Sequence, residues 1–385
     1  MTPQGKHITV LVSNDLQHDQ RVAKVCATLL EMGFRITLVG RLLPDSKPFE
    51  RPYETRRFRL PFHTGALFYA ALNVRFLFYL LLKRTDIIVA NDLDTLFPAF
   101  VVARMKGKEL VYDSHEYFTE AEGLTNRPLP KKVWLAIEGF VFPKLKHVIT
   151  VNETIAGIYR ALYHVPVNVV RNVPMLREEV VAASRDTLGL PTNKRIVLLQ
   201  GAYIDPDRGG MELAQSMEFL SDALLLIIGS GRDLENIKRE VAKRKLEDRV
   251  RFITKLPFSE LQQYTAVADV GVSLDKPLHL NYAYSLPNKL FDYIHAGLPV
   301  LVSDLPELRR VVETYSVGAV VSKIEPQDIA VSLQQMFDGG ALPVWSKNAL
   351  QAAKELNWQR EQEVVKRVYE PLRSVISAAS RQISR

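Results

Sequence analysis

A lysine and an aspartate lie three residues apart in a segment that predicts a short helix, SLPNKLFDYIHAGLPVLVSD at residues 285–304. Ser285 is a candidate cap for this helix, and Gly297 ends it. Lys289 and Asp292 then share one face near the amino terminus. A cation beside the positive end of a helix dipole is misplaced unless an anion lies between them. We interpret Lys289 as a phosphate ligand and Asp292 as an acceptor for ribose hydroxyls; a surface ion pair is the alternative.

Two other strand-to-helix turns in the second half favour the same anion. The segment GAYIDPDRGG, residues 201–210, leaves a strand, passes through a loop that contains Arg208, and enters a helix. The segment IIGSGRD, residues 227–233, does the same, and Gly229 and Gly231 let backbone amides approach a ligand closely. One such turn is weak evidence, but a doubly wound sheet places all of them along a single edge. The three turns together therefore predict a phosphate-binding edge.

The elements that position these turns are short apolar runs, which alternate with amphipathic helical stretches along nearly the whole chain. The runs are rich in Val, Ile and Leu and do not alternate in polarity, as expected of parallel strands buried on both faces. The candidate strands are 7–13, 35–40, 86–90, 109–113, 147–151 and 167–170 in the first half, and 195–201, 223–229, 250–255, 270–274, 299–303 and 317–321 in the second. This pattern predicts an α/β protein with two doubly wound, Rossmann-like domains.

The length of 385 residues is enough for two or three domains. The strand rhythm breaks near 171–193, so we place one domain at 1–172 and the other at 173–361. The helix expected at about 362–385 is a candidate to pack back on the first domain.

Composition and charge exclude several classes of protein. The single cysteine, Cys26, rules out a disulfide framework and a multi-thiolate metal cluster, and it fits a reducing compartment. No Cys, His and Asp cluster has the spacing of a zinc site.

The net charge of +7 lies mostly in residues 1–180, so the first half is expected to bind an anionic partner. The basic segments 103–109 and 127–134 lack the interleaved aromatic track of a nucleic-acid binder, so no nucleic acid is expected.

The most apolar stretch, GALFYAALNVRFLFYLLL at 65–82, is about long enough to cross a bilayer. Asn73 and Arg75 lie in its middle, and a central arginine costs about 2.5–3.5 kcal/mol on insertion scales. We therefore expect a helix that packs on the core or lies in a membrane interface, rather than a spanning helix.

The second half resembles the donor-binding domain of family 4 of the retaining nucleotide-sugar glycosyltransferases, which have the two-domain GT-B fold. The resemblance rests on the segments SLPNKLFDYIHAGLPVLVSD, GAYIDPDRGG, IIGSG and AVADVGVSL. The first half is also similar, in DQRVAKVCATLLEMGFRITLV, DIIVANDLDTL and LVYDSHE, so the match covers roughly residues 7–320. It implies two Rossmann-like domains that face each other across a cleft, the first for the acceptor and the second for the donor.

The resemblance also assigns roles to single residues. It places Arg208 and Lys289 in the diphosphate clamp and His115 opposite the reacting sugar, and we take these three as the catalytic candidates. Asp292 falls on the second Glu of the Glu-x7-Glu motif, which binds ribose. The donor-binding candidates are Asp292, Gly201, Gly229, Gly231, Tyr284, Ser285 and Asn288.

The chain departs from the family pattern at three places. Tyr284 stands where the family has the first Glu of the motif, which holds the donor sugar, and Ala202 stands near the usual arginine of the diphosphate loop. SNDLQHDQ replaces the usual Gly-Gly of the first loop. The residues expected to bind the nucleoside diphosphate are still present. The departures leave the donor sugar unassigned, and an enzyme of reduced activity is one consequence to test.

Polar residues of the first half allow two interpretations each. Asp15, His18 and Asp19 lie in the first strand-to-helix loop and are acceptor-side candidates, although such loops also use aspartates to cap helices. Asp92 and Asp94 resemble the Asp-x-Asp metal motif of the other glycosyltransferase fold, but they directly follow a strand. We favour Asp94 as a helix cap, and no metal is expected.

The expected reaction is metal-independent transfer of a sugar, with retention, from a nucleoside diphosphate sugar to a polysaccharide or lipid-linked acceptor in the cleft between the domains. No cofactor is expected, because the nucleotide sugar is a substrate and fixed cations stabilise the leaving diphosphate. Two alternatives stay open: a nucleotide-sugar epimerase of the same fold, for which we find no paired carboxylates, and a silent partner that binds nucleotide or membrane. The basic first half favours an anionic membrane surface as a further partner. An amino terminus without a signal-peptide pattern predicts a cytoplasmic protein, peripheral at the inner face of the membrane.

Overall fold

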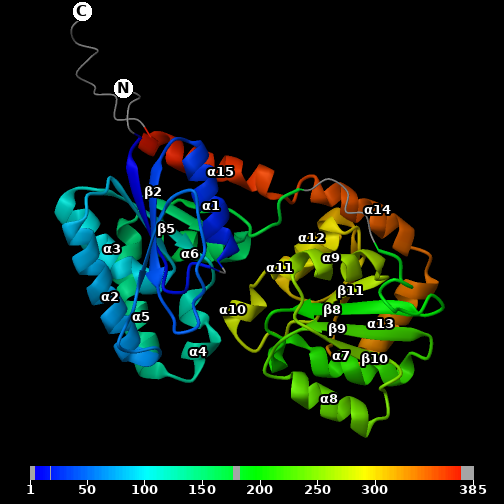
Figure 1. The fold of residues 1–385 in the computed structure, drawn as a ribbon. Helices are drawn as coiled ribbons and strands as arrows, with labels where there is room; N and C mark the ends of the chain where they lie inside the picture. Colours follow the sequence, from blue (N-terminus) through cyan, green and yellow to red (C-terminus); the bar gives the residue numbers. More distant parts are fainter. Residues whose placement is uncertain (1–4, 18, 177–182, 374–385) are drawn as a thin grey trace, which may run out of the picture. The chain divides into compact units, whose positions relative to one another are not determined.

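Two parallel β-sheets carry the fold, each in its own unit of the chain (Figure 1). The computed structural model describes residues 5–17, 19–176 and 183–373. Unit 1 consists of the described residues up to Asn172 together with those from Glu361 onward, and unit 2 is Val173–Arg360. The predicted α/β class with two Rossmann-like domains is confirmed.

The sheet of unit 1 has the strand order β3-β2-β1-β4-β5-β6-β7, and its neighbouring strands run parallel. The strands are β1 (His7–Leu11), β2 (Arg35–Arg41), β3 (Glu54–Phe58), β4 (Ile87–Asn91), β5 (Glu109–Ser114), β6 (His147–Thr150) and β7 (Val167–Val169). All of these except β3 match a predicted apolar run. β3 has the sequence ETRRF and lies at the edge of the sheet, where a strand needs only one neighbour and can be charged.

α-Helices connect these strands in sequence order, except between β2 and β3, which a loop joins. They are α1 (Gln20–Glu31), α2 (Gly65–Leu82), α3 (Leu93–Lys106), α4 (Glu122–Thr125), α5 (Pro128–Val141) and α6 (Glu153–Tyr163), with short 3₁₀ turns η1 (Phe118–Glu120) and η2 (Phe142–Lys144). The last helix, α15 (Trp358–Arg373), returns to unit 1: the ring of Tyr369 packs edge-on against Phe34, and Lys6 Nζ donates to Leu372 O at 2.7 Å. The remainder of the helix expected at 362–385 lies outside the described residues.

Helix α2 is the apolar stretch noted in the sequence. It buries one narrow stripe, Phe68, Leu72, Phe76 and Leu80. Its central polar residues contact neighbouring elements of unit 1: Asn73 Nδ2 donates to Asp94 O of α3, and the Arg75 guanidinium lies over the ring of Phe58 in β3. Its length and composition would allow it to cross a membrane, but core helices share these properties, so a single such helix is weak evidence for a span.

The sheet of unit 2 has the order β10-β9-β8-β11-β12-β13, also with parallel neighbours. Its strands are β8 (Arg195–Gly201), β9 (Ala223–Gly229), β10 (Val250–Thr254), β11 (Val270–Ser273), β12 (Val300–Ser303) and β13 (Gly318–Val321), all of them predicted. Its helices are α7 (Gly210–Ser216), α8 (Leu234–Lys243), α9 (Phe258–Val267), α10 (Leu280–Ala283), α11 (Asn288–His295), α12 (Pro306–Tyr315), α13 (Pro326–Asp338) and α14 (Leu342–Ala353), with 3₁₀ turns η3 (Pro206–Arg208) and η4 (Met217–Phe219).

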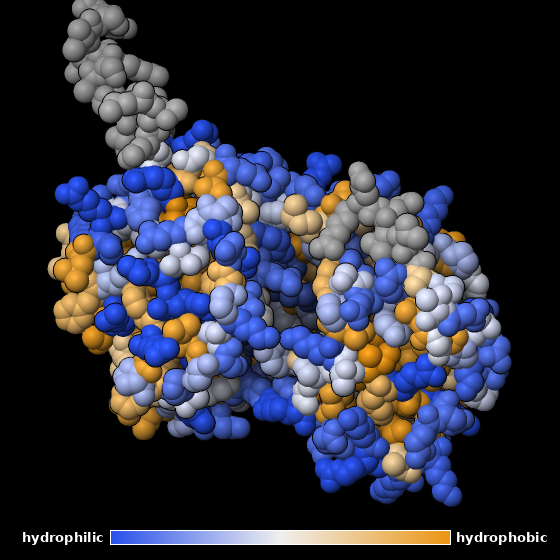
Figure 2. All heavy atoms as spheres, in the orientation of Figure 1, coloured by the Kyte–Doolittle hydropathy of each residue, from blue (hydrophilic) through white to orange (hydrophobic). Residues whose placement is uncertain are grey.

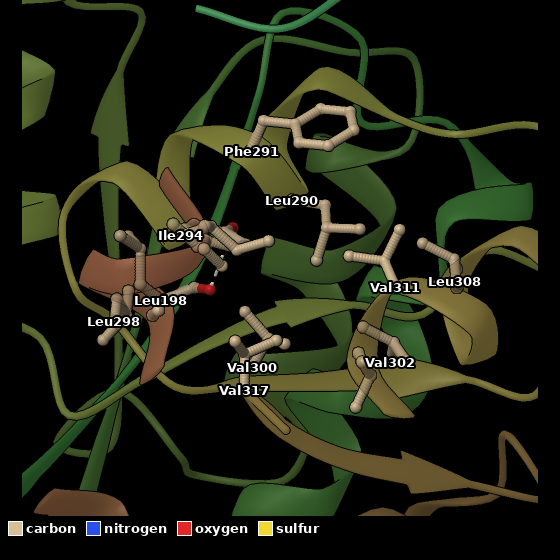
Figure 3. Close-up of a cluster of buried hydrophobic side chains, with 14 of the residues drawn as sticks. Leu198, Leu290, Phe291, Ile294, Leu298, Val300, Val302, Leu308, Val311 and Val317 are labelled. Carbon is tan, nitrogen blue, oxygen red and sulfur yellow. Dashed lines mark hydrogen bonds between the residues drawn. The ribbon is translucent and has the colours of Figure 1, made fainter. Parts of the chain in front are cut away.

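The sheet of unit 2 is buried on both faces, which explains why its strands read as continuous apolar runs. Leu198 of β8 points to one face, where it packs with side chains of α11, α12 and α14. Its neighbour Leu199 points to the other face, against α7, α8 and α13. Figure 3 shows the first cluster, in which Leu290 and Ile294 of α11 lie over Leu198 and Val300 of the sheet. This packing fixes the position of α11, the helix that carries Lys289.

Two predicted helix starts are wrong. Helix α11 begins at Asn288 and not after Ser285, whose hydroxyl donates to Tyr282 O; the residue before a proline avoids helical backbone angles, so the helix begins only after Pro287. Helix α3 begins at Leu93, which places Asp94 in its first turn and leaves Asp92 at the cap position.

Candidate functional site

Two neighbouring strands of the unit 2 sheet end in glycines where their loops begin. β8 ends at Gly201 and β9 at Gly229, and these residues are partners in the parallel register. A side chain on Gly229, whose φ is +147°, would collide with the backbone of Gly201. A side chain on Gly231 would collide with the backbone of Ile204. Glycine is therefore required here because the two turns approach each other backbone to backbone.

These close approaches allow the two loops to bond to each other. Ile204 N donates to Ser230 O at 2.7 Å, and Asp233 N donates to Ile204 O at 3.2 Å. Across the same junction, Arg232 Nη2 and Nε donate to the two oxygens of Asp205, at 3.0 and 3.1 Å. The loop 201–210 is thus held against the turn that follows β9, and η3 at its end is held with it.

Arg208 and Lys289, predicted as the cations of a diphosphate clamp, meet at one carboxylate that the sequence analysis missed. Arg208 Nη1 donates to Asp275 Oδ1 at 2.5 Å, and Lys289 Nζ lies 3.8 Å from Asp275 Oδ2. Ser273 Oγ donates to the same Oδ2 at 2.8 Å, and the Arg208 guanidinium lies 4.4 Å from the centre of the Tyr282 ring. Asp275 is completely buried, whereas the side chains of Arg208 and Lys289 are 23% and 11% exposed.

The electrostatics follow from this arrangement. Burial alone would raise the pKa of Asp275, but Lys289 and Arg208 hold it below its usual range. Burial lowers the pKa of Lys289, against the effect of Asp275, while Asp275 raises the pKa of Arg208 against the effect of burial. Two cations and one carboxylate leave an excess of positive charge beside the amino terminus of α11, which suits an anionic ligand.

Asp292, predicted to bind ribose, lies one turn further along α11. Its Oδ2 accepts from Gln200 Nε2 at 3.3 Å, and Gln200 Oε1 in turn accepts from Thr265 Oγ1 at 2.9 Å. The next residue, Tyr293, is buried under the sheet, and its hydroxyl accepts from Gln200 N at 3.1 Å. The end of β8 therefore orients the carboxylate of Asp292.

The other donor-side candidates lie in the segment that leads into α11. Tyr284 follows α10 and is half-buried, Ser285 donates to Tyr282 O at 2.9 Å, and Asn288 is the exposed first residue of α11. Ala202, which stands in place of the family arginine, is exposed in the loop after β8. Arg232 contributes a cation beside this loop, but it is bound to Asp205.

In unit 1, alternating charges form a chain at the ends of β4 and β5. Arg21 Nη2 lies 2.6 Å from Asp113 Oδ1, and both side chains are almost fully buried. His115 Nε2 lies 3.6 Å from Asp113 Oδ2 and 3.2 Å from Asn91 Oδ1. On its other side, His115 Nδ1 lies 3.5 Å from Asp92 Oδ2, and its backbone N donates to Asp92 Oδ1 at 2.8 Å.

The two flanking carboxylates, Asp92 and Asp113, keep the side chain of His115 protonated at neutral pH. Burial alone would lower its pKa, but Asp92 and Asp113 raise it to about 9. Burial, with the Asp92 charge beside it, raises the pKa of Asp94 to about 7. Asp92 itself has φ +60°, a backbone conformation that side chains other than glycine rarely adopt. A strained carboxylate next to a charged imidazole, at the carboxyl edge of a parallel sheet, is the pattern of a functional position.

The acceptor-side candidates of the first loop make local bonds. Asp19 caps α1, because its carboxylate accepts from Val22 N at 3.0 Å. Asp15 accepts from Arg57 Nη1 at 3.3 Å and is 9% exposed. His18 lies outside the described residues. The cap alternative thus holds for Asp19, and Asp15 anchors a neighbouring loop; the acceptor-side role of all three stays a prediction.

The two carboxylates of the Asp-x-Asp pair have different surroundings. Asp92 is bound to His115, and Asp94 is buried in the first turn of α3. Within the part of the chain that the structure describes, no group of three or more His, Cys, Asp or Glu side chains is placed to hold a metal ion.

Two family models match the sequence. The model described as glycosyltransferase family 4 matches residues 20–174, and the model described as glycosyl transferases group 1 matches residues 194–338. No curated protein matches the chain significantly.

Solved structures share the whole fold at low identity. Sucrose-phosphate synthase from Thermosynechococcus elongatus has a TM-score of 0.78 and 18% identity, over 95% of this chain and 99% of that one. HepE from Anabaena, in complex with UDP and glucose, has a TM-score of 0.71 and 15% identity, over 96% and 100%. WaaG, a glycosyltransferase involved in lipopolysaccharide biosynthesis, has a TM-score of 0.69 and 15% identity, over 94% and 99%.

The resemblance noted in the sequence is therefore confirmed in both halves of the chain. The protein belongs to the glycosyltransferases and joins a family 4 domain to a group 1 domain in one GT-B fold.

Proposed function

We propose that the protein transfers a sugar from a UDP-sugar to a polysaccharide or lipid-linked acceptor, with retention at the anomeric carbon and without a metal ion. Unit 2 would bind the donor and unit 1 the acceptor. HepE was crystallised with UDP and with glucose, and WaaG acts in lipopolysaccharide biosynthesis, which supports this choice of donor and acceptor.

The observation that carries the proposal is the meeting of Arg208 and Lys289 beside the amino terminus of α11. A departing nucleoside diphosphate develops negative charge on its oxygens. Fixed cations and helix amides stabilise that charge without reorganising, and removing one such group typically slows an enzyme about a hundredfold to a thousandfold. The two cations take the place of a metal ion in this mechanism.

The proposed retaining step needs no protein nucleophile. The departing phosphate oxygen accepts the proton of the acceptor hydroxyl, while that hydroxyl attacks the anomeric carbon from the same side. His115 is unsuited to act as the base, because its ring is already protonated at neutral pH. We assign it instead a cationic role, in which it orients Asp92 and stabilises negative charge near the reacting sugar.

The outer helices of unit 1 support a lipid-linked acceptor. Large apolar side chains of α2, α3 and α5 are exposed, namely Leu67, Val74, Phe78, Leu82, Phe97, Met105, Leu129, Val133 and Phe140. Figure 2 shows hydrophobic side chains gathered along the edge of unit 1 where α2 and α3 lie. Exposed basic residues border them, namely Arg75, Lys83, Arg84, Arg104 and Lys132. An apolar face with a basic border suits an interface that contains anionic lipid, with the protein peripheral at the cytoplasmic face of a membrane.

An epimerase of the same fold is the second candidate, and the donor site argues against it. An epimerase must remove a proton from the sugar ring, which requires an accessible base. Asp275 is fully buried between two cations, and Asp292 accepts from Gln200. A silent nucleotide-binding partner is the third candidate, favoured only by Tyr284 and Ala202.

One experiment separates the three candidates. The protein is given UDP-, GDP- and ADP-sugars with and without an acceptor, and diphosphate release and sugar stereochemistry are followed. Release of UDP only with acceptor, and an α-linked product from an α-linked donor, are expected. Isomerised sugar without acceptor would show an epimerase, and binding without turnover would show a silent partner.

Metal independence and membrane binding have their own tests. Transfer should proceed unchanged in excess EDTA, and loss of activity that Mg²⁺ restores would contradict the metal-free mechanism. Liposomes of phosphatidylglycerol should bind the protein at low salt and release part of it as salt screens the basic border. Equal binding to phosphatidylcholine liposomes would contradict the role of the charges.

A further inference from the structure

Asp275 is the buried carboxylate that joins the two cations of the donor site. It lies two residues after the end of β11, Arg208 reaches it from η3, and Lys289 reaches it from the first turn of α11. Three separate segments of unit 2 therefore converge on one carboxylate with no exposed surface. Because it is fully buried, Asp275 touches neither sugar nor diphosphate directly.

We propose that Asp275 is a positioning residue: its carboxylate holds Arg208 and Lys289 together so that both cations act on the same diphosphate. The inference rests on the proposed function only in taking a diphosphate as the ligand of this site.

Repulsion between the two cations makes a carboxylate necessary here. Two neighbouring cations that are largely withdrawn from water repel each other, and without a counter-charge a flexible side chain such as Arg208 would turn toward solvent. Asp275 cancels one of the two charges and leaves the other available to an incoming anion. A neutral side chain of the same shape would keep the packing and lose this effect.

The orientation of the carboxylate is also fixed from behind. Ser273 Oγ donates to Oδ2, so the lone pairs that remain are directed toward the two cations. On the other side of Arg208, the ring of Tyr282 covers the guanidinium at 4.4 Å. Arg208 is thus placed between a carboxylate and an aromatic ring, and its position does not depend on a bound ligand.

The test uses Asp275→Asn and a matched control that flanks the same strand, Asp269→Asn. Asp269 lies at the opposite end of β11, is 16% exposed, and also faces two cations, Arg185 at 2.8 Å and Arg195 at 3.6 Å. Both variants remove one charge of a two-cation cluster in unit 2, but only Asp275 lies at the donor edge. Binding of inorganic pyrophosphate and of UDP is measured by calorimetry, after circular dichroism has shown that each variant is folded.

For Asp275→Asn we expect affinity for both ligands to fall about tenfold to a hundredfold, as for lost hydrogen bonds to charged groups. Asp269→Asn should bind both as the parent does. Unchanged or tighter binding by folded Asp275→Asn would refute the proposal, since the carboxylate would then only compete with the diphosphate. An equal loss in Asp269→Asn would also refute it, since the effect would then be a general loss of stability.

A double-mutant comparison tests whether Asp275 acts through Lys289. Lys289→Met removes one of the two cations. In Lys289→Met/Asp275→Asn only Arg208 remains of the two, so no pair of cations is left without its carboxylate. A residue that acts through Lys289 should have a much smaller effect on pyrophosphate affinity in the Lys289→Met background. A full, additive effect would contradict positioning.

The pH dependence supplies a readout that a merely structural role would not move. Arg208 and Asp275 are the charged groups that act on Lys289, and Asp275 is the one that favours its protonated form. Without that carboxylate, pyrophosphate binding should be lost at lower pH than in the parent protein. If the parent binds pyrophosphate but transfers no sugar, the proposed function fails and this inference stands; if it binds neither pyrophosphate nor UDP, this inference fails.

Discussion

The charge on His115 should make unit 1 less stable as the pH rises, and His115→Gln should remove that dependence. The folded protein holds the pKa of His115 at about 9, against 6.5 for the free side chain. The stabilisation is fully present below pH 6.5 and is lost as the pH rises through 9, and it amounts to about 3 kcal/mol. Between pH 7.5 and 9 the expected loss is roughly 1–2 kcal/mol.

The assay must report on unit 1 alone, and the chain offers a probe for this. The protein has three tryptophans, of which Trp134 lies in α5 of unit 1 and Trp345 and Trp358 lie in unit 2. With the latter two replaced by phenylalanine, the fluorescence of Trp134, which is 7% exposed, follows unit 1 through a urea titration. The urea midpoints of unfolding at pH 7.5 and pH 9 are compared between this background protein and its His115→Gln variant. The control is His63→Gln, which changes an exposed loop residue.

The pH window also separates His115 from its acidic neighbour. Burial raises the pKa of Asp94 to about 7 against 3.8, so most of its contribution to stability is lost as the pH rises through 7, below the window in which His115 loses its proton. A parent midpoint that does not fall between pH 7.5 and 9 would refute the reasoning. So would an NMR titration that finds His115 with an ordinary midpoint, or a pH dependence that survives in His115→Gln.

Four further perturbations have defined outcomes. Lys289→Ala should slow sugar transfer about a hundredfold to a thousandfold, and the loss should be larger in kcat than in the KM for the acceptor. Asp292→Ala should weaken UDP but leave pyrophosphate binding unchanged by calorimetry, because the carboxylate is assigned to ribose. Gly231→Ala should weaken both ligands, since its Cβ would meet the backbone of Ile204 and force the two loops apart; normal affinity would contradict the packing. Asp113→Asn should destabilise unit 1 by about 3–5 kcal/mol in the Trp134 assay, because it leaves the buried Arg21 charge unpaired.

The parts of the fold that could be predicted from the sequence are those whose burial requires a recognisable run of apolar residues. Strands β8 and β9 are covered on both faces, so their runs of Val, Leu and Ile identify them without any tertiary information. Strand β3 has no such mark, because an edge strand with the sequence ETRRF depends on its backbone pairing to β2. The start of α11 was misplaced because a cap residue and a proline compete for it, and the restriction before Pro287 prevails.

The site divides in a similar way. Arg208 and Lys289 stand in turns with a recognisable pattern, so their position could be predicted from the sequence. Asp275 could not, because an aspartate after a strand has many uses, and only the fold brings it to both cations. The same holds for Asp113, which lies 92 residues from Arg21 in the sequence. One signal was available for Asp275: it ends the run VGVSLD at the sheet edge where the other turns lie.

The return of α15 to unit 1 bears on how the chain folds during synthesis. Unit 2 is a continuous segment and has all its residues once position 360 has left the ribosome. Unit 1 draws on both ends of the sequence, so Phe34 gains its ring contact only after Tyr369 of α15 has been made. The half of the protein that is made first is thus completed last, and the face that α15 covers is exposed until then.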